Sequence, residues 1–416
     1  MAKVLYVIHR FWPYMGGAER HFFELARRTA ALGHTVSVFA TDAWDIEHLN
    51  HAGRKRIERL REQTDGLEIR RFRVRHLPGQ RHWLRWLSRF PLRSCRQLFG
   101  HPHILVPGYT WSLGTTRQRF DLVHAGVFPH TYLVASAYGY CRRQGVPLVC
   151  QPLLNLGEPH SAMDNPHFLS AEQLWLLSRA NAILTNTAFE KEVLVAKGIP
   201  GEKITVAGPG VTPAEVVGGN GEAFRQQRGI TGPMVLQVSS QTFDKGSVHT
   251  VEALKLLWQR GFDVTLVMIG QVLSDFALYV AMQAPSVRAK LLILDYVSED
   301  EKRDALAACD VFVMPSRADS FGIVYLEAWL HRKPVIGCYA GGVSRVVEDG
   351  RSGCLVPFGD VYMMAEYIAM LLSDRTLAAR MGEQGYQDVM TKYTWEQSWS
   401  KVQEVYDRLL TRGESG

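Results

Sequence analysis

The N-terminal forty residues carry the feature that most restricts the fold, a strand, a glycine-containing loop, a helix and a second strand in succession. The spacing predicts a strand over 3–9, a loop over 11–17, a helix over 18–32 and a strand over 35–40. Gly33 is a typical helix stop signal. Two strands joined by one helix pair in parallel, so we expect an α/β domain with a parallel sheet.

A chain of 416 residues is too long for one ordinary core, and the same organisation begins again in the second half. Residues 213–221 hold one proline and three glycines and are typical of a linker. A strand over 234–239, a loop over 240–246 and a helix over 247–260 then repeat the opening order. The spacing predicts two doubly wound domains, at 1–212 and 222–393.

One turn in the second half joins a buried strand to a helix. The apolar run at 310–314 predicts the strand, and apolar side chains recur at helical spacing from Phe321. Asp319 and Ser320 are good cap residues for that helix. The first N–H groups of a helix attract anions, and a glycine allows close approach. We therefore expect the backbone N–H groups of Ser320, Phe321 and Gly322 to face an anionic ligand.

Two acids belong to this helix, Asp319 at its start and Glu327 about two turns in. Carboxylates accept hydrogen bonds but do not donate them. Beside an anion-binding turn, they suit a ligand with both phosphates and hydroxyls, such as a nucleotide sugar. The alternative is an ordinary strand–turn–helix with surface acids.

Three further loops follow predicted strands and contain the glycines that close approach of a ligand requires. One also carries a lysine just before a helix, where it is placed to neutralise a diphosphate. The carboxyl ends of parallel strands are the usual ligand site of open α/β sheets. A lone lysine or glycine pair is more often an ordinary surface feature, but several such loops at strand ends favour a ligand site. The residues are Gly16, Gly17, Lys245, Gly246, Gly341 and Gly342.

Residues 81–99 alternate basic and aromatic side chains at helical spacing. A basic stripe opposite an aromatic stripe is typical of a helix lying on anionic lipid, and Pro91 would kink it. The alternative is an amphipathic helix whose aromatics pack on the protein. The basic stripe is Arg81, Arg85, Arg89, Arg93 and Arg96, and the opposite face holds Trp83, Trp86, Leu87, Phe90 and Leu98.

The net charge of +6 is unevenly distributed, since residues 54–119 contain 16 basic and 4 acidic side chains. Such a patch fits a polyanionic partner, and without a nucleic-acid motif we expect anionic lipid and no nucleic acid. The chain has no apolar run long enough to span a bilayer, and its N-terminus lacks a signal-peptide cleavage site. Six scattered cysteines predict buried free thiols. We expect a cytoplasmic protein, peripheral to the inner face of the plasma membrane if the basic stripe contacts lipid.

Short motifs spread over nearly the whole chain together resemble the retaining glycosyltransferases of family 4. The pair of acids separated by seven residues is specific when it occurs with the lysine loop and the glycine loops. The matching pieces are Pro13 with Gly16 and Gly17, residues 33–36, 121–124, 186–190 and 198–200, Gly210 with Val211, Lys245 with Gly246, residues 315–316, 319–322 and 327–328, Gly341 with Gly342, and residues 349–353.

This resemblance implies a GT-B fold, in which two Rossmann-like domains face a cleft and the last helix, 394–416, packs back on the first domain. It implies transfer of a hexose-type sugar, with retention, from a UDP or GDP sugar to an acceptor hydroxyl, with no metal and no other cofactor. The acceptor would be a glycan or a lipid-linked, membrane-near molecule.

The resemblance also implies roles for individual residues. Glu327 would bind the donor ribose and Asp319 the transferred sugar. Lys245 would stabilise the diphosphate. The remaining donor-binding residues would be Gly16, Gly17, Ser240, Ser320, Phe321, Gly322, Gly341 and Gly342.

Four positions depart from the family pattern. Ser240 stands where the family has an arginine, and Arg317 or Arg345 would have to supply that charge. Gly126 replaces a histidine that lines the sugar site, and His124 or His130 would take over that role; with Lys245, Asp319 and Glu327, His124 is predicted to be catalytic. The remaining departures are Asp319 for glutamate and Thr212 for aspartate. They leave open an alternative, a degenerate protein that binds a nucleotide sugar without turnover.

Overall fold

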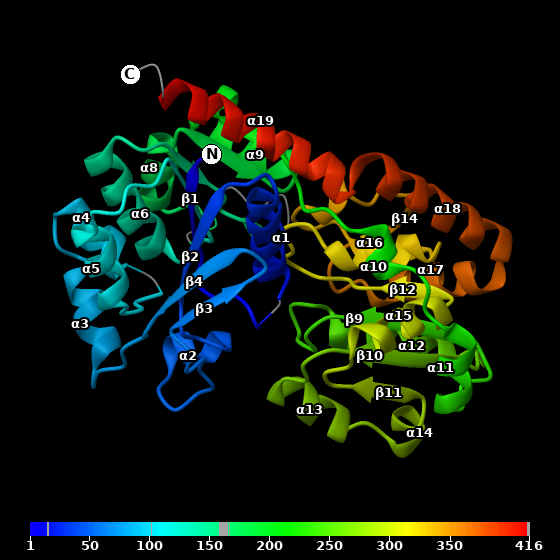
Figure 1. Ribbon diagram of the computed structural model, residues 1–416. Helices are drawn as coiled ribbons and strands as arrows, with labels where there is room; N and C mark the ends of the chain where they lie inside the picture. The colour runs from blue at the N-terminus through cyan, green and yellow to red at the C-terminus, as the bar shows by residue number, and fades with distance from the viewer. Residues whose placement is uncertain (15, 101, 158–164, 166, 414–416) are drawn as a thin grey trace. The chain divides into compact units, whose positions relative to one another are not determined.

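The computed structural model describes residues 1–14, 16–100, 102–157, 165 and 167–413. They divide into two compact units (Figure 1). The first contains the chain up to Leu154, its continuation to Gly208 and the C-terminal residues from Trp399. The second is built mainly from Pro209–Ser398.

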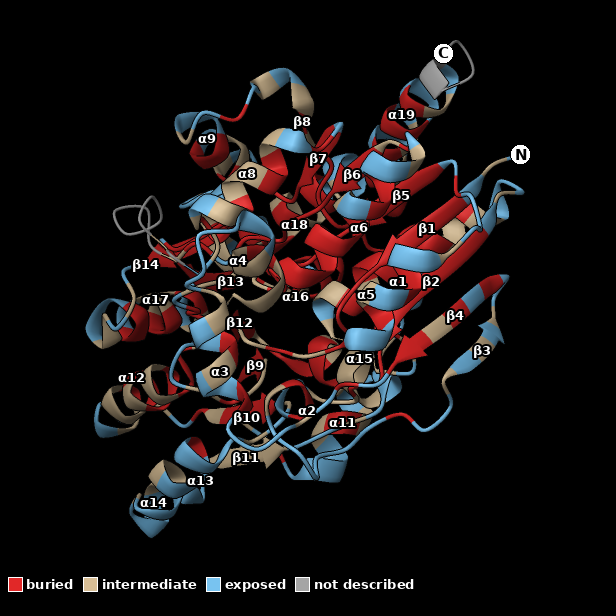
Figure 2. Cartoon of the chain, turned by 90° about the vertical axis from the view of Figure 1, so that its left-hand side faces the viewer, coloured by how far each residue is buried: buried red, intermediate tan, exposed pale blue. Residues whose placement is uncertain are grey.

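The first unit is organised around a sheet of eight described strands in the order β3-β4-β2-β1-β5-β6-β7-β8. Every pairing is parallel except that of β3 with β4. β1 is fully buried from Val4 to Val7, as expected for a parallel strand covered on both faces (Figure 2). The strands are β1 Lys3–Val7, β2 Thr35–Thr41, β3 Arg61–Thr64, β4 Leu67–Phe72, β5 Leu122–Ala125, β6 Leu148–Cys150, β7 Ala182–Thr185 and β8 Ile204–Val206.

Helices connect these strands and cover the sheet. α1 follows the first strand directly, and its apolar face packs inward, with Phe22, Leu25 and Ala26 fully buried. The helices are α1 Gly17–Ala31, α2 Ile46–Asn50, α3 Gln80–Leu87, α4 Arg93–Phe99, α5 Pro107–Thr115, α6 Thr131–Gln144, α8 Ala171–Arg179, α9 Ala188–Ala196, the short η1 Gly201–Lys203, and α19 Trp395–Gly413, whose residues from Trp399 belong to this unit.

The second unit has a sheet of six described strands, all parallel, in the order β11-β10-β9-β12-β13-β14. The strands are β9 Met234–Val238, β10 Thr265–Ile269, β11 Leu291–Leu294, β12 Val311–Val313, β13 Val335–Cys338 and β14 Gly353–Val356. The helices are α10 Pro213–Val216, α11 Gly221–Arg228, α12 Ser247–Gln259, α13 Ser274–Ala281, α14 Pro285–Arg288, α15 Glu299–Ala308, α16 Ile323–Leu330, η2 Val343–Arg345, α17 Val361–Ser373 and α18 Arg375–Lys392.

The prediction of a single amphipathic helix over 81–99 is wrong. α3 ends at Leu87 and α4 begins at Arg93, so the helix is interrupted where a kink was expected. Pro91 lies in the break. Proline has no N–H to donate and disfavours helical backbone in the residue before it, so a continuous helix is not formed here.

The cysteines agree with the expectation of free thiols. All six are free, and all are buried except Cys95, which is half-buried.

Candidate functional site

Two loops of the second unit meet at the carboxyl ends of the neighbouring strands β9 and β12. Lys245 lies at the end of the first loop, just before α12, and Asp319 lies in the second, before α16. The Nζ atom of Lys245 donates to Oδ2 of Asp319 at 2.7 Å, and both side chains keep some exposure to solvent. The fold therefore brings together two predicted site residues that are 74 positions apart in the sequence.

The helix after Asp319 begins later than expected. α16 starts at Ile323, because Gly322 has a φ of 82° and cannot be part of a right-handed helix. The N–H of Phe321 is directed to Oδ1 of Asp319 at 3.3 Å, a local turn of the kind that aspartate favours. The positive end of the helix therefore lies at Ile323, and the expectation that the helix starts at Phe321 is wrong.

The glycine pair after β13 packs against this turn. The N–H of Gly342 donates to the carbonyl oxygen of Asp319 at 3.0 Å. At Gly341, φ is 54° and an added Cβ atom would lie 2.2 Å from the same oxygen. Only glycine fits there, so the third predicted loop is fixed beside Asp319.

Glu327 lies on the inward face of α16 and is only 4% exposed. Its Oε1 accepts a hydrogen bond from Nζ of Lys302 on α15 at 3.1 Å, and Glu299 lies 2.9 Å from the same nitrogen. Burial lowers the pKa of Lys302, but the two carboxylates outweigh this and raise it, so the lysine stays charged. The buried Oε2 of Glu327 has no hydrogen-bond partner among the described residues.

Lys302 is a site residue that the sequence did not reveal. It follows three acids on α15, and a lysine in that context is typical of a solvated helix face. No motif links it to Glu327.

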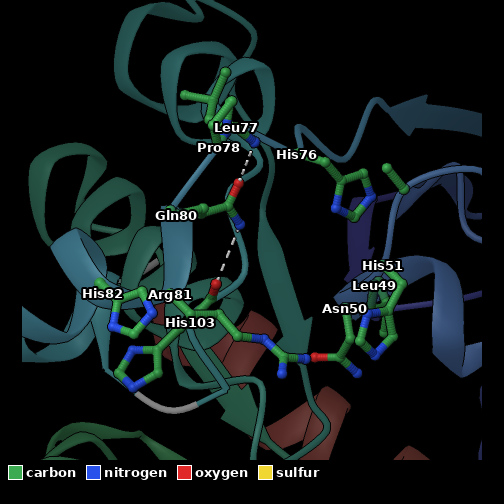
Figure 3. A pocket seen from close by; sticks show the side chains of 12 residues that line it. Leu49, Asn50, His51, His76, Leu77, Pro78, Gln80, Arg81, His82 and His103 are labelled. Carbon is green, nitrogen blue, oxygen red and sulfur yellow. Dashed lines mark hydrogen bonds between the residues drawn. The ribbon is translucent and has the colours of Figure 1, made fainter.

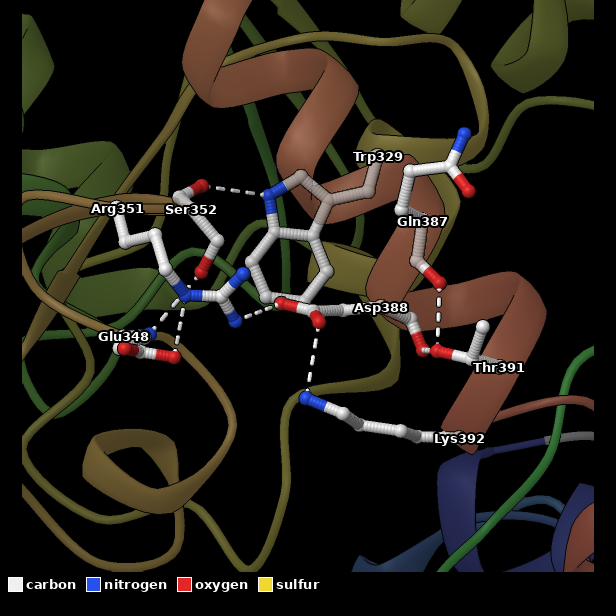
Figure 4. A network of polar contacts seen from close by, with 8 residues as sticks. All are labelled: Trp329, Glu348, Arg351, Ser352, Gln387, Asp388, Thr391 and Lys392. Atoms are coloured by element: carbon white, nitrogen blue, oxygen red, sulfur yellow. Dashed lines mark hydrogen bonds and ion pairs between the residues drawn. The ribbon is translucent and has the colours of Figure 1, made fainter.

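The far end of α16 is held by the network in Figure 4. Nε1 of Trp329 donates to the carbonyl of Ser352 at 2.9 Å. The carboxylate of Asp388 on α18 forms ion pairs with Arg351 and Lys392. An added Cβ atom at Gly385 would lie 2.1 Å from the Trp329 ring, so α16 and α18 pack closely. This packing fixes the helix that carries Glu327.

Ser240, predicted to bind the donor, lies half-exposed in the loop between β9 and α12. It adds no charge where the resemblance implies an arginine. Arg317 pairs with Asp244, next to Lys245 in the chain, with an Nη2–Oδ1 distance of 2.9 Å. Arg317 therefore lies beside the Lys245 loop but is paired with a carboxylate, and its role toward a diphosphate stays a prediction. Arg345 lies in η2, after the glycine pair.

In the first unit, Gly16 and Gly17 form the turn between β1 and α1, and α1 begins at Gly17. An added Cβ atom at Gly16 would lie 2.5 Å from Oε2 of Glu19. Glu19 is buried, pairs with Arg10 at 2.9 Å and lies 3.3 Å from Nε2 of His9.

Next to this turn, the rings of His9 and His130 stack with centroids 4.3 Å apart. Burial lowers the pKa of His9 well below its usual value, and His130 and Arg10 lower it further. The histidine is therefore neutral. Sequence reasoning named His130 but missed His9 and the Arg10–Glu19 pair, whose only signal is their position around the first turn.

His124, predicted to be catalytic, is fully buried. Its Nδ1 lies 2.6 Å from the hydroxyl of Tyr406 on α19, and that hydroxyl also bonds Tyr6 at 2.8 Å. Burial, together with nearby His21, lowers the pKa of His124 to about 3. This geometry gives His124 a structural contact with the last helix and does not expose it to a substrate.

Gly126 occupies a position at which the resemblance implies a histidine. An added Cβ atom there would lie 2.3 Å from the carbonyl oxygen of Gln151 and 2.7 Å from the Phe22 ring. No side chain fits here without displacing backbone, so the local packing of this chain requires glycine at position 126.

The basic and aromatic residues of α3 are partly on the surface. Trp86 is 60% exposed, and Arg81, Arg85 and Arg89 are exposed as well, whereas Trp83 is half-buried. Arg93 and Arg96 do not continue the stripe, because both pair with Glu172 on α8, at 3.5 Å and 2.6 Å. The basic side chains of the stripe that have no carboxylate partner among the described residues are thus Arg81, Arg85 and Arg89, although Arg93 also remains exposed.

The described part of the chain offers neither a cluster of metal ligands nor a membrane-spanning helix. It contains no group of three or more His, Cys, Asp or Glu side chains placed to hold a metal ion. No helix within it is both long and apolar enough to cross a membrane.

Family models match both halves of the chain. Residues 16–210 match the glycosyl transferase 4-like domain, and residues 221–388 match the glycosyl transferases group 1. The chain is 25% identical to a glycogen synthase of Mycobacterium tuberculosis over 407 residues, which cover 95% of this chain and 92% of that protein. It is 29% identical to the alpha-D-kanosaminyltransferase of Streptomyces kanamyceticus over 42% of this chain and 45% of that protein.

Among solved structures, the fold is similar to that of Anabaena HepE in complex with UDP and glucose. The TM-score is 0.74 at 19% identity, and the match covers 98% of this chain and 100% of the other. Two parallel-sheet α/β units with this similarity define a GT-B fold. Together with the two family matches, they show that the chain belongs to the group 1 glycosyltransferases.

Proposed function

We propose that this glycosyltransferase moves a sugar from a nucleotide-diphosphate sugar to an acceptor hydroxyl with retention of anomeric configuration. The observation that carries the proposal is the meeting of Lys245, Asp319 and the Gly341–Gly342 loop at the carboxyl ends of three neighbouring strands. The complex of the structurally similar HepE with UDP and glucose supports a sugar nucleotide of UDP type as the donor.

In this proposal, the resting ion pair exchanges partners when the donor binds. Lys245 turns from Asp319 to the diphosphate, whose growing charge it stabilises as the glycosidic bond to the leaving nucleotide breaks. Asp319 is then free to accept hydrogen bonds from hydroxyls of the transferred sugar. Because cations and a helix end supply the charge, the reaction requires no metal.

Glu327 binds the ribose of the donor. Its buried Oε2, which has no hydrogen-bond partner among the described residues, accepts a ribose hydroxyl, while Lys302 holds Oε1.

The acceptor belongs to a growing glycan, and we propose that it is linked to lipid or lies near a membrane. Support comes from α3 and the residues after it, where exposed Trp86 and Phe90 lie among Arg85 and Arg89. Tryptophan and arginine side chains favour the interface of an anionic bilayer such as the cytoplasmic leaflet.

Vesicle flotation tests the membrane contact. The triple variant Arg85→Gln/Trp86→Ala/Arg89→Gln should lose binding to vesicles of phosphatidylcholine and phosphatidylglycerol. The control Arg375→Gln/Arg380→Gln/Tyr362→Ala removes two exposed arginines and an exposed aromatic from the second unit and should bind as the wild type does. Equal flotation of the triple variant and the wild type would refute the contact.

The donor reaction is tested by incubating the protein with UDP and GDP sugars and following sugar release or transfer by NMR. The α-linked donor should give an α-linked product, and EDTA should leave the rate unchanged. A β-linked product would overturn retention, and a rate abolished by EDTA and restored by a divalent cation would overturn metal independence.

A further inference from the structure

The first unit contains a cavity of about 510 Å³ whose wall is rich in histidine (Figure 3). Its described lining residues include four histidines and one arginine, and none of these twelve residues is acidic. Its polar side chains are those of Asn50, His51, His76, Gln80, Arg81, His82 and His103.

The cavity is built by segments that follow two neighbouring parallel strands. The segment after β2 provides His51 and the segment after β4 provides His76, so the cavity lies at the carboxyl edge of the sheet. Gln80 fastens the wall, because its Oε1 accepts from the N–H of Leu77 at 3.0 Å and its Nε2 donates to the carbonyl of His103 at 3.3 Å (Figure 3).

The first βα turn, at Gly16 and Gly17, lies at the same sheet edge. β1 is separated from β4 only by β2. With strands about 4.8 Å apart, the lateral separation of β1 and β4 is about 10 Å. The cavity thus lies about two strand spacings from the first βα turn of the same unit.

Its chemistry is that of an anion site. His51, Arg81 and His82 are exposed, and Nε2 of His76 is buried without a hydrogen-bond partner among the described residues. Every imidazole offers at least one N–H donor, and an arginine is always charged.

The carboxylates nearest in the chain are already engaged. Asp42 accepts from the N–H of Val74 at 2.9 Å, and Glu47 pairs with Arg54 at 3.1 Å. The histidines are also not arranged as a metal site, because the described residues contain no such group.

We infer that this cavity binds a phosphate group carried by the acceptor, with His51, His76, Arg81 and His82 donating to its oxygens. That the phosphate belongs to an acceptor rests on the proposed function, whereas its binding in the cavity does not. In this inference Arg81 binds the phosphate group, whereas Arg85 and Arg89 contact the lipid surface.

The test is a titration of the full-length protein, labelled with ¹³C at histidine Cε1, with inorganic phosphate and no nucleotide sugar. The signals of His51, His76 and His82, assigned from single glutamine variants, should shift and saturate. His51→Gln/His82→Gln and Arg81→Gln should each weaken phosphate binding at His76 about fivefold or more, the effect of losing charge-assisted contacts. His34→Gln, on the segment before β2 and thus at the opposite sheet edge, is the matched control and should bind phosphate as the wild type does.

A second titration with vesicles containing phosphatidic acid identifies the source of the phosphate. The same shifts with vesicles would assign the site to a lipid headgroup, and shifts with inorganic phosphate alone to a soluble phosphate ester. Cavity signals that move only at concentrations where His34 also moves, or unchanged affinity in both cavity variants, would overturn the inference. Neither readout depends on sugar transfer, so a failed transfer assay would overturn the proposed function alone.

Discussion

Lys245 and Asp319 form an ion pair of 2.7 Å between loops that follow neighbouring strands. This ion pair would have to break when a diphosphate sugar binds. The pair therefore holds the lysine near its working position while competing with the ligand for its charge.

The variant Asp319→Asn should for this reason bind UDP more tightly and transfer sugar more slowly. Removing a partly exposed ion pair of up to about 1 kcal/mol should lower the Kd for UDP up to about fivefold. Calorimetry measures the affinity. Asp263→Asn, which removes an exposed carboxylate paired with Lys290, should change the Kd little. Weaker UDP binding by Asp319→Asn would contradict the competition.

Lys302→Met should destabilise the second unit. It leaves the buried Glu327 carboxylate without its cation, and breaking a buried pair costs about 3 kcal/mol or more. Urea unfolding measures the loss. The double variant Lys302→Met/Glu327→Gln should recover part of it, because no buried charge remains. Additive losses in the double variant would show that the two side chains do not interact.

Tyr406→Phe should lower the melting temperature and leave the turnover number unchanged. The variant removes the hydroxyl that bonds His124 and Tyr6, at a cost of about 1–3 kcal/mol for buried groups left without partners. Calorimetry and initial rates well below the transition measure the two effects. Tyr362→Phe, at an exposed tyrosine, is the control. An unchanged melting temperature with a large loss of turnover would instead support a catalytic His124.

Glu190 should make the first unit less stable as pH rises. Burial raises its pKa from 4.5 to about 8, although the N–H groups of Leu154 and Asn186 oppose this. The neutral carboxyl therefore contributes stability fully below pH 4.5, and this contribution is lost between about 4.5 and 8.

The variant Glu190→Gln, which cannot ionise, should thus gain more in melting temperature over the wild type at pH 8 than at pH 5. Glu192→Gln changes an exposed carboxyl on the same helix and should show no such difference between the two pH values. An equal effect of Glu190→Gln at both values would mean that Glu190 ionises normally.

Much of the fold could be predicted because periodicity is a local property. The strand–helix alternation around Gly16 and Gly17, the second doubly wound domain and the strand before Asp319 all follow from side-chain spacing. The start of α16 could not be placed, because it depends on the positive φ of Gly322.

Residues of the candidate site could be predicted only where a side chain of suitable chemistry follows directly after a predicted strand. Lys245, Asp319 and Gly341 stand at strand ends, and the parallel sheet brings those ends together. Lys302 joins Glu327 through tertiary packing alone, and His124 contacts the hydroxyl of Tyr406, 282 residues away. Neither relationship has a local signal.

The measurement that bears most directly on the central claim is nucleotide release from a panel of UDP and GDP sugars by the wild type and three variants. The wild type should turn over at least one donor. Lys245→Ala should lower kcat about 10²–10³-fold, or about 3–4 kcal/mol, as expected for loss of a group that stabilises developing charge. Glu327→Gln should raise KM for that donor. Lys255→Ala, whose side chain has the same 28% exposure as that of Lys245 and also pairs with a carboxylate, should behave as the wild type does.

Two results would contradict the account. Wild-type rates in Lys245→Ala would show that Lys245 does not stabilise the leaving diphosphate. Tight nucleotide binding by the wild type without turnover of any donor would show a protein that only binds nucleotide sugars.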